Sequence, residues 1–263
     1  MENRTTMEDT LFVPVMGRIY TTEHFPDILT DEAARKMELP AHLKNQKLQN
    51  QYGALTGAVR SAAFDRYILD FLTRHPDGVI VQLGCGLETT YQRCDNGHAT
   101  WYEVDFPDTI QLRRSVLREQ DREHFFPGNP FALEWLSRIR QQDPKVPILV
   151  TAGGLLHYFE QEKIEGLIRK IQAAGHVELL FDAMNADGIQ RMAGYMAQSG
   201  HDPSLNYFHV DHSAALAKKL HAKVLLDELY FSHVDLSKLG FLARSAMKKS
   251  DKHRLMKIVA LKL

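Results

Sequence analysis

Short runs of apolar residues alternate with longer amphipathic stretches along most of the chain. A short continuous apolar run is typical of a buried strand, and apolar residues recurring every three or four positions are typical of a helix. The runs predict strands at 78–83, 100–104, 124–126, 147–152, 177–182, 224–231 and 255–263. The amphipathic stretches predict helices at 31–39, 54–72, 107–120, 131–141 and 160–174, with further helices over 184–222 broken at 199–203.

The helix at 54–72 carries a charge on its apolar face. Phe64, Ile68, Phe71 and Leu72 form one stripe, and Arg60 lies on the same side. A charge on a core-facing stripe is costly unless it is paired. Arg60 therefore either reaches solvent at the helix end or meets an anion, such as the carboxylate of a bound amino acid.

Strands that alternate with helices predict a parallel sheet with helices on both faces. The last two strands are separated by 235–251, where we expect only a short helix, so they should be antiparallel neighbours at one edge. The fold class is therefore α/β, with a mostly parallel sheet and one reversed strand. Residues 1–263 are interpreted as a single domain, to which an N-terminal helical cap (1–75) and a helical insertion (184–222) are added.

Composition narrows the class of protein. With 263 residues, 44% of them hydrophobic, the chain can bury a full core. A net charge of −1 predicts no nucleic-acid partner. The sequence shows neither a secretory signal nor a membrane span, and two cysteines make no disulfide framework. We therefore expect a cytoplasmic protein without a membrane partner or a metal site, of undetermined oligomeric state.

Two glycines follow the first strand of the sheet. In parallel sheets ligands bind beyond the carboxyl ends of the strands, and Gly84 and Gly86 stand at such an end. They allow the backbone to approach a nucleotide-like ligand, but Thr89 replaces the third glycine of the dinucleotide fingerprint. A nucleoside cofactor without phosphates fits this loop better, and a plain tight turn is the alternative.

An acidic residue closes the second strand. Asp105 lies about 20 positions after Gly84, which is the separation at which a carboxylate binds a ribose diol. The alternative is that Asp105 caps the helix that begins at Pro107. Together with the glycine loop, the spacing favours ribose binding.

Several stretches together carry a resemblance to a known family. They are AVR at 58–60, VQLGCGLETT with Gln82 at its second position (81–90), Arg93, WYEVDFP at 101–107 and AGGLLHYF at 152–159. In order and spacing these resemble the leucine carboxyl methyltransferase superfamily, in particular its bacterial branch of tetracenomycin-type polyketide O-methyltransferases. The resemblance implies a class I methyltransferase with a Rossmann-like, seven-stranded sheet, S-adenosylmethionine as cofactor, and inserted helices that form a lid.

The resemblance also implies roles for individual residues. Arg60 would hold the cofactor's carboxylate and Asp105 its ribose hydroxyls. The methionine and ribose portion would lie on the loop of Gly84, Cys85, Gly86 and Glu88. The family's adenine contact corresponds loosely to Asn129 and Pro130, and its contact to the cofactor's amino-acid end corresponds to Gly153.

The chain departs from the family pattern at Gly153, where the family has a glutamate. Losing a charged hydrogen bond to the cofactor's ammonium group costs about 1.5–3 kcal/mol, a roughly tenfold to hundredfold weakening. Glu88, itself a replacement for the family's aspartate, or a water molecule would have to compensate. Otherwise the chain is a catalytically silent homologue that serves as a binding or interaction module.

We expect an O-methyltransferase that acts on a hydroxyl or carboxylate of a small metabolite; a protein C-terminal carboxyl methyltransferase is the alternative. A hydroxyl acceptor requires a general base, whereas a carboxylate acceptor requires none. His157 and Tyr91 are the candidate catalytic residues. The alternative for His157 is a packed or surface histidine at a helix start.

Overall fold

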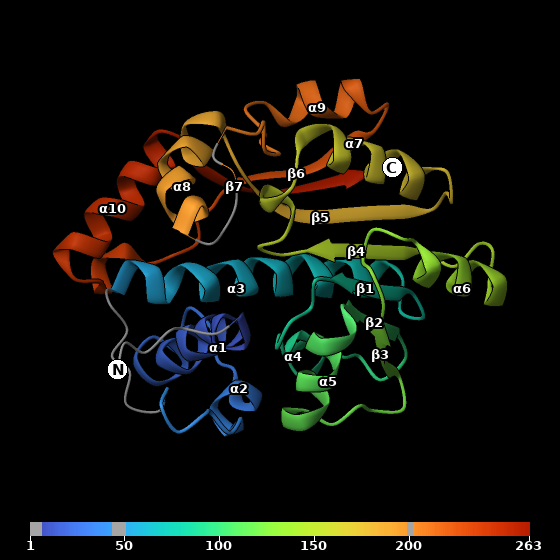
Figure 1. The fold of residues 1–263 in the computed structure, drawn as a ribbon, viewed down its shortest axis with the longest axis horizontal. Coiled ribbons are helices and arrows are strands. Elements are labelled where there is room, and N and C mark those ends of the chain that lie inside the picture. The colour runs from blue at the N-terminus through green and yellow to red at the C-terminus, as the bar shows by residue number, and fades with distance from the viewer. Residues whose placement is uncertain (1–6, 44–50, 199–201, 203) are drawn as a thin grey trace.

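A computed structural model describes residues 7–43, 51–198, 202 and 204–263. Its centre is a seven-stranded sheet in the order β3-β2-β1-β4-β5-β7-β6 (Figure 1). The strands are β1 (Val79–Leu83), β2 (Thr100–Asp105), β3 (Glu123–Pro127), β4 (Ile148–Ala152), β5 (Val177–Met184), β6 (Lys223–Leu229) and β7 (Met256–Lys262). All seven predicted strands are confirmed.

Strands β1 to β5 are parallel to one another, and β7 pairs antiparallel with both β5 and β6. The predicted mostly parallel sheet with one reversed strand is therefore confirmed. The carboxyl ends of β1, β2, β4 and β5 consequently lie at one edge of the sheet. In the β4–β5 pair, Ala152 lies opposite Phe181, so the residues that follow them are also neighbours.

Helices cover both faces of the sheet (Figure 1). Along β1, Val79 and Val81 contact one core cluster and Ile80 contacts the other, as strand geometry requires. One cluster includes residues of α3 and α10, and the other includes residues of α6, α7 and α9. The helices are α1 (Met7–His24), α2 (Glu32–Lys36), α3 (Gln51–Arg74), α4 (Thr90–Cys94), α5 (Pro107–Val116), α6 (Glu134–Gln142), α7 (Gln161–Gln172), α8 (Ala186–Gln198), α9 (Ser213–Lys219) and α10 (Phe241–Lys252).

Within the N-terminal region, interpreted as a helical cap, the sequence pattern assigned no range to the first helix, α1. Helix α1 has a proline inside it, Pro14, and its buried residues Phe12, Val15 and Met16 are flanked by short polar pieces. A proline inside a helix removes a backbone donor and argues against a helix in a sequence reading. α1 packs against α3 and lies below it at the lower left of Figure 1.

One expectation about the C-terminal half is corrected. The segment between β6 and β7 forms the 12-residue helix α10. Its buried residues are Ala243, Met247 and Ser250, and of these only Met247 is a large apolar residue, so the helix gives little hydrophobic signal. Within the predicted helical insertion, helix α9 buries Leu216 in the core cluster on one face of the sheet. The expected break at 199–203 falls mostly outside the described residues.

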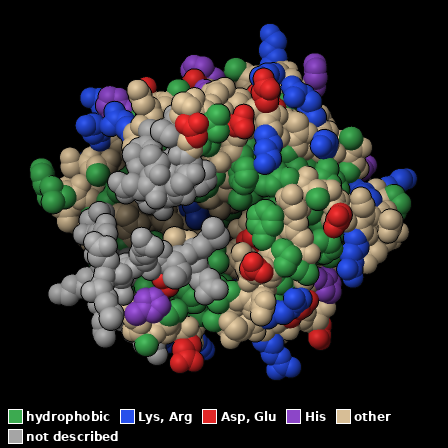
Figure 2. All heavy atoms as spheres, in the orientation of Figure 1, with side chains coloured by type: hydrophobic (Ala, Val, Ile, Leu, Met, Phe, Trp, Pro, Cys, Tyr) green, Lys and Arg blue, Asp and Glu red, His purple; other side chains and the backbone are tan. Residues whose placement is uncertain are grey.

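The face in Figure 2 carries interspersed basic and acidic side chains, and hydrophobic side chains gather to the right of its centre. Within the described ranges, no helix is both long and apolar enough to cross a membrane.

Candidate functional site

The loop after β1 has a backbone that favours glycine. Gly84 and Gly86 have φ angles of 64° and 48°, in the left-handed region. A Cβ on Gly84 would lie 2.9 Å from a methyl carbon of Leu155, which follows β4. The N–H of Gly84 donates to the carbonyl of Val104 at 2.9 Å. The loop is thus held between the ends of β2 and β4.

Asp105 is joined to this loop through its carboxylate. It accepts hydrogen bonds from the N–H groups of Gly86, at 2.9 Å, and Phe106, at 2.8 Å. Burial raises the pKa of Asp105, although both N–H groups act to lower it. The N-cap of α5 is Phe106, so the alternative that Asp105 is the N-cap of this helix is wrong. The structure therefore brings together two of the residues singled out from spacing.

Cys85, within the glycine loop, and the loop after β3 both lie next to Asp105. The Cys85 side chain packs with Ile110 in the core, and burial raises the pKa of its thiol. Only the backbone of Cys85 is thus available to a ligand at the loop. On the other side, the N–H of Gly128 donates to the Asp105 carbonyl at 2.8 Å, which brings the neighbouring residues Asn129 and Pro130 close to Asp105.

An exposed aromatic residue beside Asp105 was missed by the sequence reading. Phe106 is 49% exposed, although it directly follows the buried strand β2. An apolar residue after a strand gives no signal of exposure, because it reads as a continuation of the strand.

Arg60 reaches the carboxyl ends of β4 and β5. Its Nη1 lies 3.4 Å from Asp182 Oδ2, and its side chain is 19% exposed. Burial acts to lower the pKa of Arg60, but the Asp182 carboxylate raises it, and the net direction is upward. A Cβ on Gly153 would lie 3.3 Å from Arg60 Nε, and one on Gly154 would lie 2.6 Å from Nη1. Arg60 thus does meet an anion, but the anion is a carboxylate of the protein.

The two candidate catalytic residues have different surroundings. His157, only 3% exposed, lies in a single 3-10 turn, and its Nδ1 has no hydrogen-bond partner among the residues described. Burial lowers its pKa; Asp182 acts to raise it and Arg60 to lower it. Tyr91 is buried, and its ring packs edge-on against Trp101 at 5.6 Å. Tyr91 thus packs in the core of the protein.

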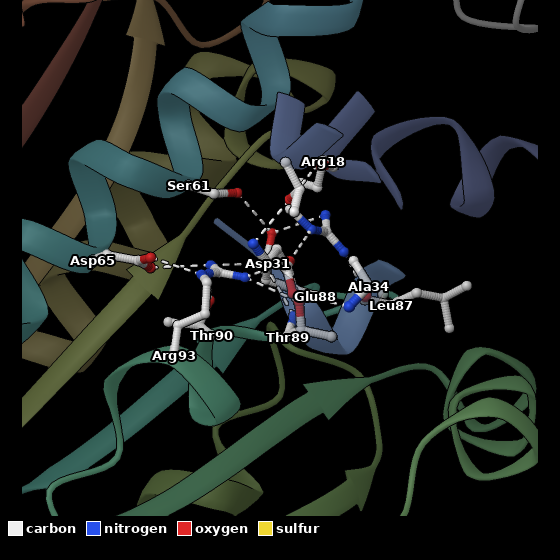
Figure 3. Close-up of polar contacts among 12 residues, drawn as sticks. Arg18, Asp31, Ala34, Ser61, Asp65, Leu87, Glu88, Thr89, Thr90 and Arg93 are labelled. Atoms are coloured by element: carbon white, nitrogen blue, oxygen red, sulfur yellow. Dashed lines mark hydrogen bonds and ion pairs between the residues drawn. The ribbon is translucent and has the colours of Figure 1, made fainter. Parts of the chain in front are cut away.

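Glu88 belongs to a buried ionic network that the sequence did not reveal (Figure 3). Its Oε2 accepts from Arg18 at 3.2 Å and from Ser61 at 3.0 Å. Its Oε1 accepts from the Thr89 N–H and lies 3.0 Å from Arg93 Nη2. Burial would raise the pKa of Glu88, but the arginines outweigh it and hold the pKa far below its usual value. Because both oxygens are engaged, the idea that Glu88 compensates for Gly153 is not supported.

The same network connects the N-terminal region to the glycine loop. Arg18 of α1 donates to Asp31 at 2.9 Å and to the Leu87 carbonyl at 2.8 Å. Arg93 of α4 also reaches Asp31, at 2.8 Å, and is paired with Asp65 of α3 at 2.7 Å (Figure 3). Three helices and the loop are therefore held by one set of charges.

A second buried charge cluster lies beneath the loop. Arg113 of α5 donates to the carbonyls of Gly86, at 3.1 Å, and Glu88, at 2.7 Å. Its guanidinium lies 3.1 Å from Glu123 and 3.8 Å from Glu103. Burial raises the pKa of Glu103 to about 8, although Arg113 acts to lower it. Arg113 is therefore a positioning residue for the loop, and it was missed because an arginine in an amphipathic helix gives no such signal.

Two solved structures superpose on this fold over most of its length. A DUF574 family protein from Streptomyces avermitilis superposes with a TM-score of 0.56 at 12% identity, over 94% of this chain and 96% of that one. Magnesium protoporphyrin IX methyltransferase from Synechocystis, solved with bound S-adenosylhomocysteine, superposes with a TM-score of 0.50 at 11% identity, over 95% and 98%. At this level of identity the likeness shows the fold alone, a class I methyltransferase sheet.

Sequence relatives match parts of the chain. The tetracenomycin polyketide synthesis O-methyltransferase of Streptomyces glaucescens is 31% identical over 113 residues, which cover 43% of this chain and 41% of that protein. An S-adenosylmethionine-dependent methyltransferase, itself named as putative, of Mycolicibacterium vanbaalenii is 29% identical over 151 residues, or 54% and 50%. The chain spans about half the length of the curated relatives it matches.

A family model gives the assignment. The model described as leucine carboxyl methyltransferase matches residues 9–172, from α1 through α7, which is more than half of the chain. The matched span contains Arg60, the glycine loop, Asp105 and Gly153. The chain therefore belongs to the leucine carboxyl methyltransferase family.

Proposed function

We propose that this protein is an S-adenosylmethionine-dependent O-methyltransferase whose acceptor is a hydroxyl or carboxylate of a small metabolite. The observation that carries the proposal is the bond between Asp105 and the Gly86 N–H, which joins a left-handed glycine loop to an acidic strand end. Membership of the family and the name of the Streptomyces glaucescens relative support it.

The residues at the strand ends fit this cofactor. The Asp105 carboxylate has lone pairs beyond the two that its backbone donors use, so it can also accept from a ribose diol. The exposed ring of Phe106 offers an apolar face for a base. Arg60 and Asp182 supply one charge of each sign for an amino-acid group. The loop offers no phosphate site of the dinucleotide type, which agrees with a cofactor that has no phosphate.

The chain's own contribution to the reaction is mainly positioning. S-adenosylmethionine supplies a methyl group that is already activated. The protein must hold the acceptor oxygen in line with it and keep water away. For a hydroxyl acceptor, His157 Nδ1 is our candidate base, because it has no hydrogen-bond partner among the described residues and burial lowers the pKa of the ring, which favours its neutral form. A hydroxyl proton would pass to Nδ1; a carboxylate acceptor would need no such transfer.

Binding is tested first, by calorimetric titration with S-adenosylmethionine and S-adenosylhomocysteine. We expect micromolar binding to the wild type and a loss of about 2 kcal/mol or more in the Asp105→Asn variant, because an amide cannot accept two hydrogen bonds from the diol as a carboxylate does. Thermal melting of the variant shows whether it is folded. A folded wild type that binds neither ligand would refute the proposal and favour a silent interaction module.

The acceptor class is tested next, with cofactor carrying a labelled methyl group. Candidate hydroxylated aromatic compounds and carboxylic acids are incubated with the protein, and the products are treated with mild base. A methyl ester releases volatile methanol under this treatment, whereas a methyl ether does not. For a hydroxyl acceptor we also expect the rate of a His157→Asn variant to fall; an unchanged rate would remove His157 as the base.

A further inference from the structure

The amino-acid end of the proposed cofactor is a zwitterion, so its site requires a cation and an anion side by side. The family pattern places the anion at position 153, where this chain has a glycine. Among the described residues, Asp182 is the carboxylate that contacts both Arg60 and this glycine pair. We propose that Asp182 binds the ammonium group of the cofactor, in place of the absent glutamate, while Arg60 binds the carboxylate. This inference rests on the proposed function.

The backbone places Asp182 in register with position 153. Ala152 of β4 lies opposite Phe181 of β5, so Gly153 and Asp182 are the next residues at the same sheet edge. The N–H of Gly154 donates to Asp182 Oδ1 at 2.6 Å, which fixes the carboxylate against the loop after β4. Asp182 is thus able to act from β5 on the space that a side chain at 153 would otherwise enter.

The glycine pair also leaves room for the guanidinium. A Cβ at Gly153 would approach Arg60 Nε to 3.3 Å and the Phe64 ring to 3.2 Å, and one at Gly154 would clash with Arg60 Nη1 at 2.6 Å. The absence of side chains at 153 and 154 therefore allows Arg60 to lie over the end of β4. The glycine pair at 153 and 154 therefore accounts both for the missing glutamate and for the close approach of Arg60.

The Arg60–Asp182 pair is suited to opening for a ligand. Its separation of 3.4 Å is long for a charged hydrogen bond, and the Asp182 side chain is only 4% exposed. Asp182 already accepts from the Gly154 N–H, but its contact with a cation is long. A closer cation would stabilise the buried carboxylate, since a poorly paired charge is costly in a low dielectric. A zwitterion that enters between the two groups would give each of them a closer partner and keep the site neutral.

The test compares three ligands by calorimetry. S-adenosylhomocysteine carries both charged groups, its deamino analogue keeps only the carboxylate, and 5′-methylthioadenosine lacks both. We expect Asp182→Asn to weaken binding of S-adenosylhomocysteine by about tenfold to hundredfold. 5′-Methylthioadenosine should bind the variant as it binds the wild type. The deamino analogue should bind the variant at least as tightly as the wild type, because removing the Asp182 charge frees Arg60 for its carboxylate. Arg60→Gln should instead weaken both ligands that carry the carboxylate.

Glu178→Gln is the matched control, because Glu178 is the other buried carboxylate of β5 and is paired with Arg74 at 2.8 Å at the opposite end of the strand. It should leave all three affinities unchanged. Equal weakening of the deamino analogue by Asp182→Asn would overturn the ammonium contact, as would unchanged binding of S-adenosylhomocysteine. A wild type that binds 5′-methylthioadenosine but not S-adenosylhomocysteine would overturn the zwitterion site alone. No binding of any of the three ligands would refute the proposed function as well.

Discussion

Replacing Arg18 with methionine tests whether the charge network in Figure 3 stabilises the fold. Methionine keeps the apolar stem of the side chain and removes its charge and donors. The Arg18 side chain is 2% exposed and serves two carboxylates, Asp31 and Glu88, as well as the Leu87 carbonyl. Its loss leaves these acceptors buried with fewer donors.

The expected loss of stability depends on the ion pairs that Asp31 and Glu88 keep in the variant. Removing one partner of a buried ion pair costs about 3–5 kcal/mol. Asp31 and Glu88 both keep Arg93 as a partner, at 2.8 Å and 3.0 Å. We therefore expect the lower part of that range, about 3–4 kcal/mol in the free energy of unfolding. For a domain of this size the midpoint of thermal unfolding should fall by about 6–16 °C.

Urea unfolding followed by tryptophan fluorescence measures this loss, because Trp101 and Trp135 are both fully buried. The slope of the transition should stay the same while its midpoint shifts. Arg35→Met is the matched control: its ion pair with Glu32 is exposed, so the midpoint should not move measurably. An Arg18→Met variant that unfolds at the wild-type midpoint would show that the network adds nothing to stability.

Three further outcomes are expected. The pKa of Glu103 is about 8 in the folded state against a usual 4.5, so the folded protein retains a proton that the unfolded chain releases. The stability that this group contributes is present at low pH and is lost as the pH rises to about 8. The urea midpoint of Glu103→Gln should therefore depend less on pH than that of the wild type, and parallel pH profiles of the two proteins would contradict this. Gly154→Ala should lower the free energy of unfolding by about 1–3 kcal/mol, because the φ of Gly154 is 67° and the new Cβ would lie 2.6 Å from a guanidinium nitrogen. Gly57 lies in a helix with open space around it, so Gly57→Ala should instead raise the free energy of unfolding by about 0.5–1 kcal/mol in the same urea assay. Cys85 and Cys94 are buried with raised thiol pKa values, so a disulfide reagent should label them only after urea unfolding; rapid labelling of the native protein would contradict their burial.

The sheet could be predicted because its strands are short apolar runs separated by amphipathic helices. The glycine loop and Asp105 could be predicted because both stand at strand ends that parallel pairing brings together. Arg60 could be recognised as unusual from its position on an apolar stripe. In each of these cases the signal lies within about 20 residues of chain.

The partners of these residues could not be predicted. Asp182 is 122 positions from Arg60, and Glu88 is 70 positions from Arg18. Which carboxylate contacts which arginine depends on the order of the strands and on the position of α1. The local periodicity of apolar residues predicts neither. Glu88 illustrates the limit, because nothing in its local sequence indicated that Arg18 and Arg93 contact its carboxylate.

The position of β7 has a consequence for synthesis on the ribosome. β5 acquires its second neighbour only from β7, which is about 70 residues later in the chain and fills the place between β5 and β6. At a translation rate of about 5–20 residues per second, the edge of β5 stays unpaired in the nascent chain for roughly 4–14 seconds. During that time an apolar strand presents unpaired backbone groups to other chains. Slower translation over α9, β6 and α10 should therefore increase the demand for a chaperone that covers strand edges.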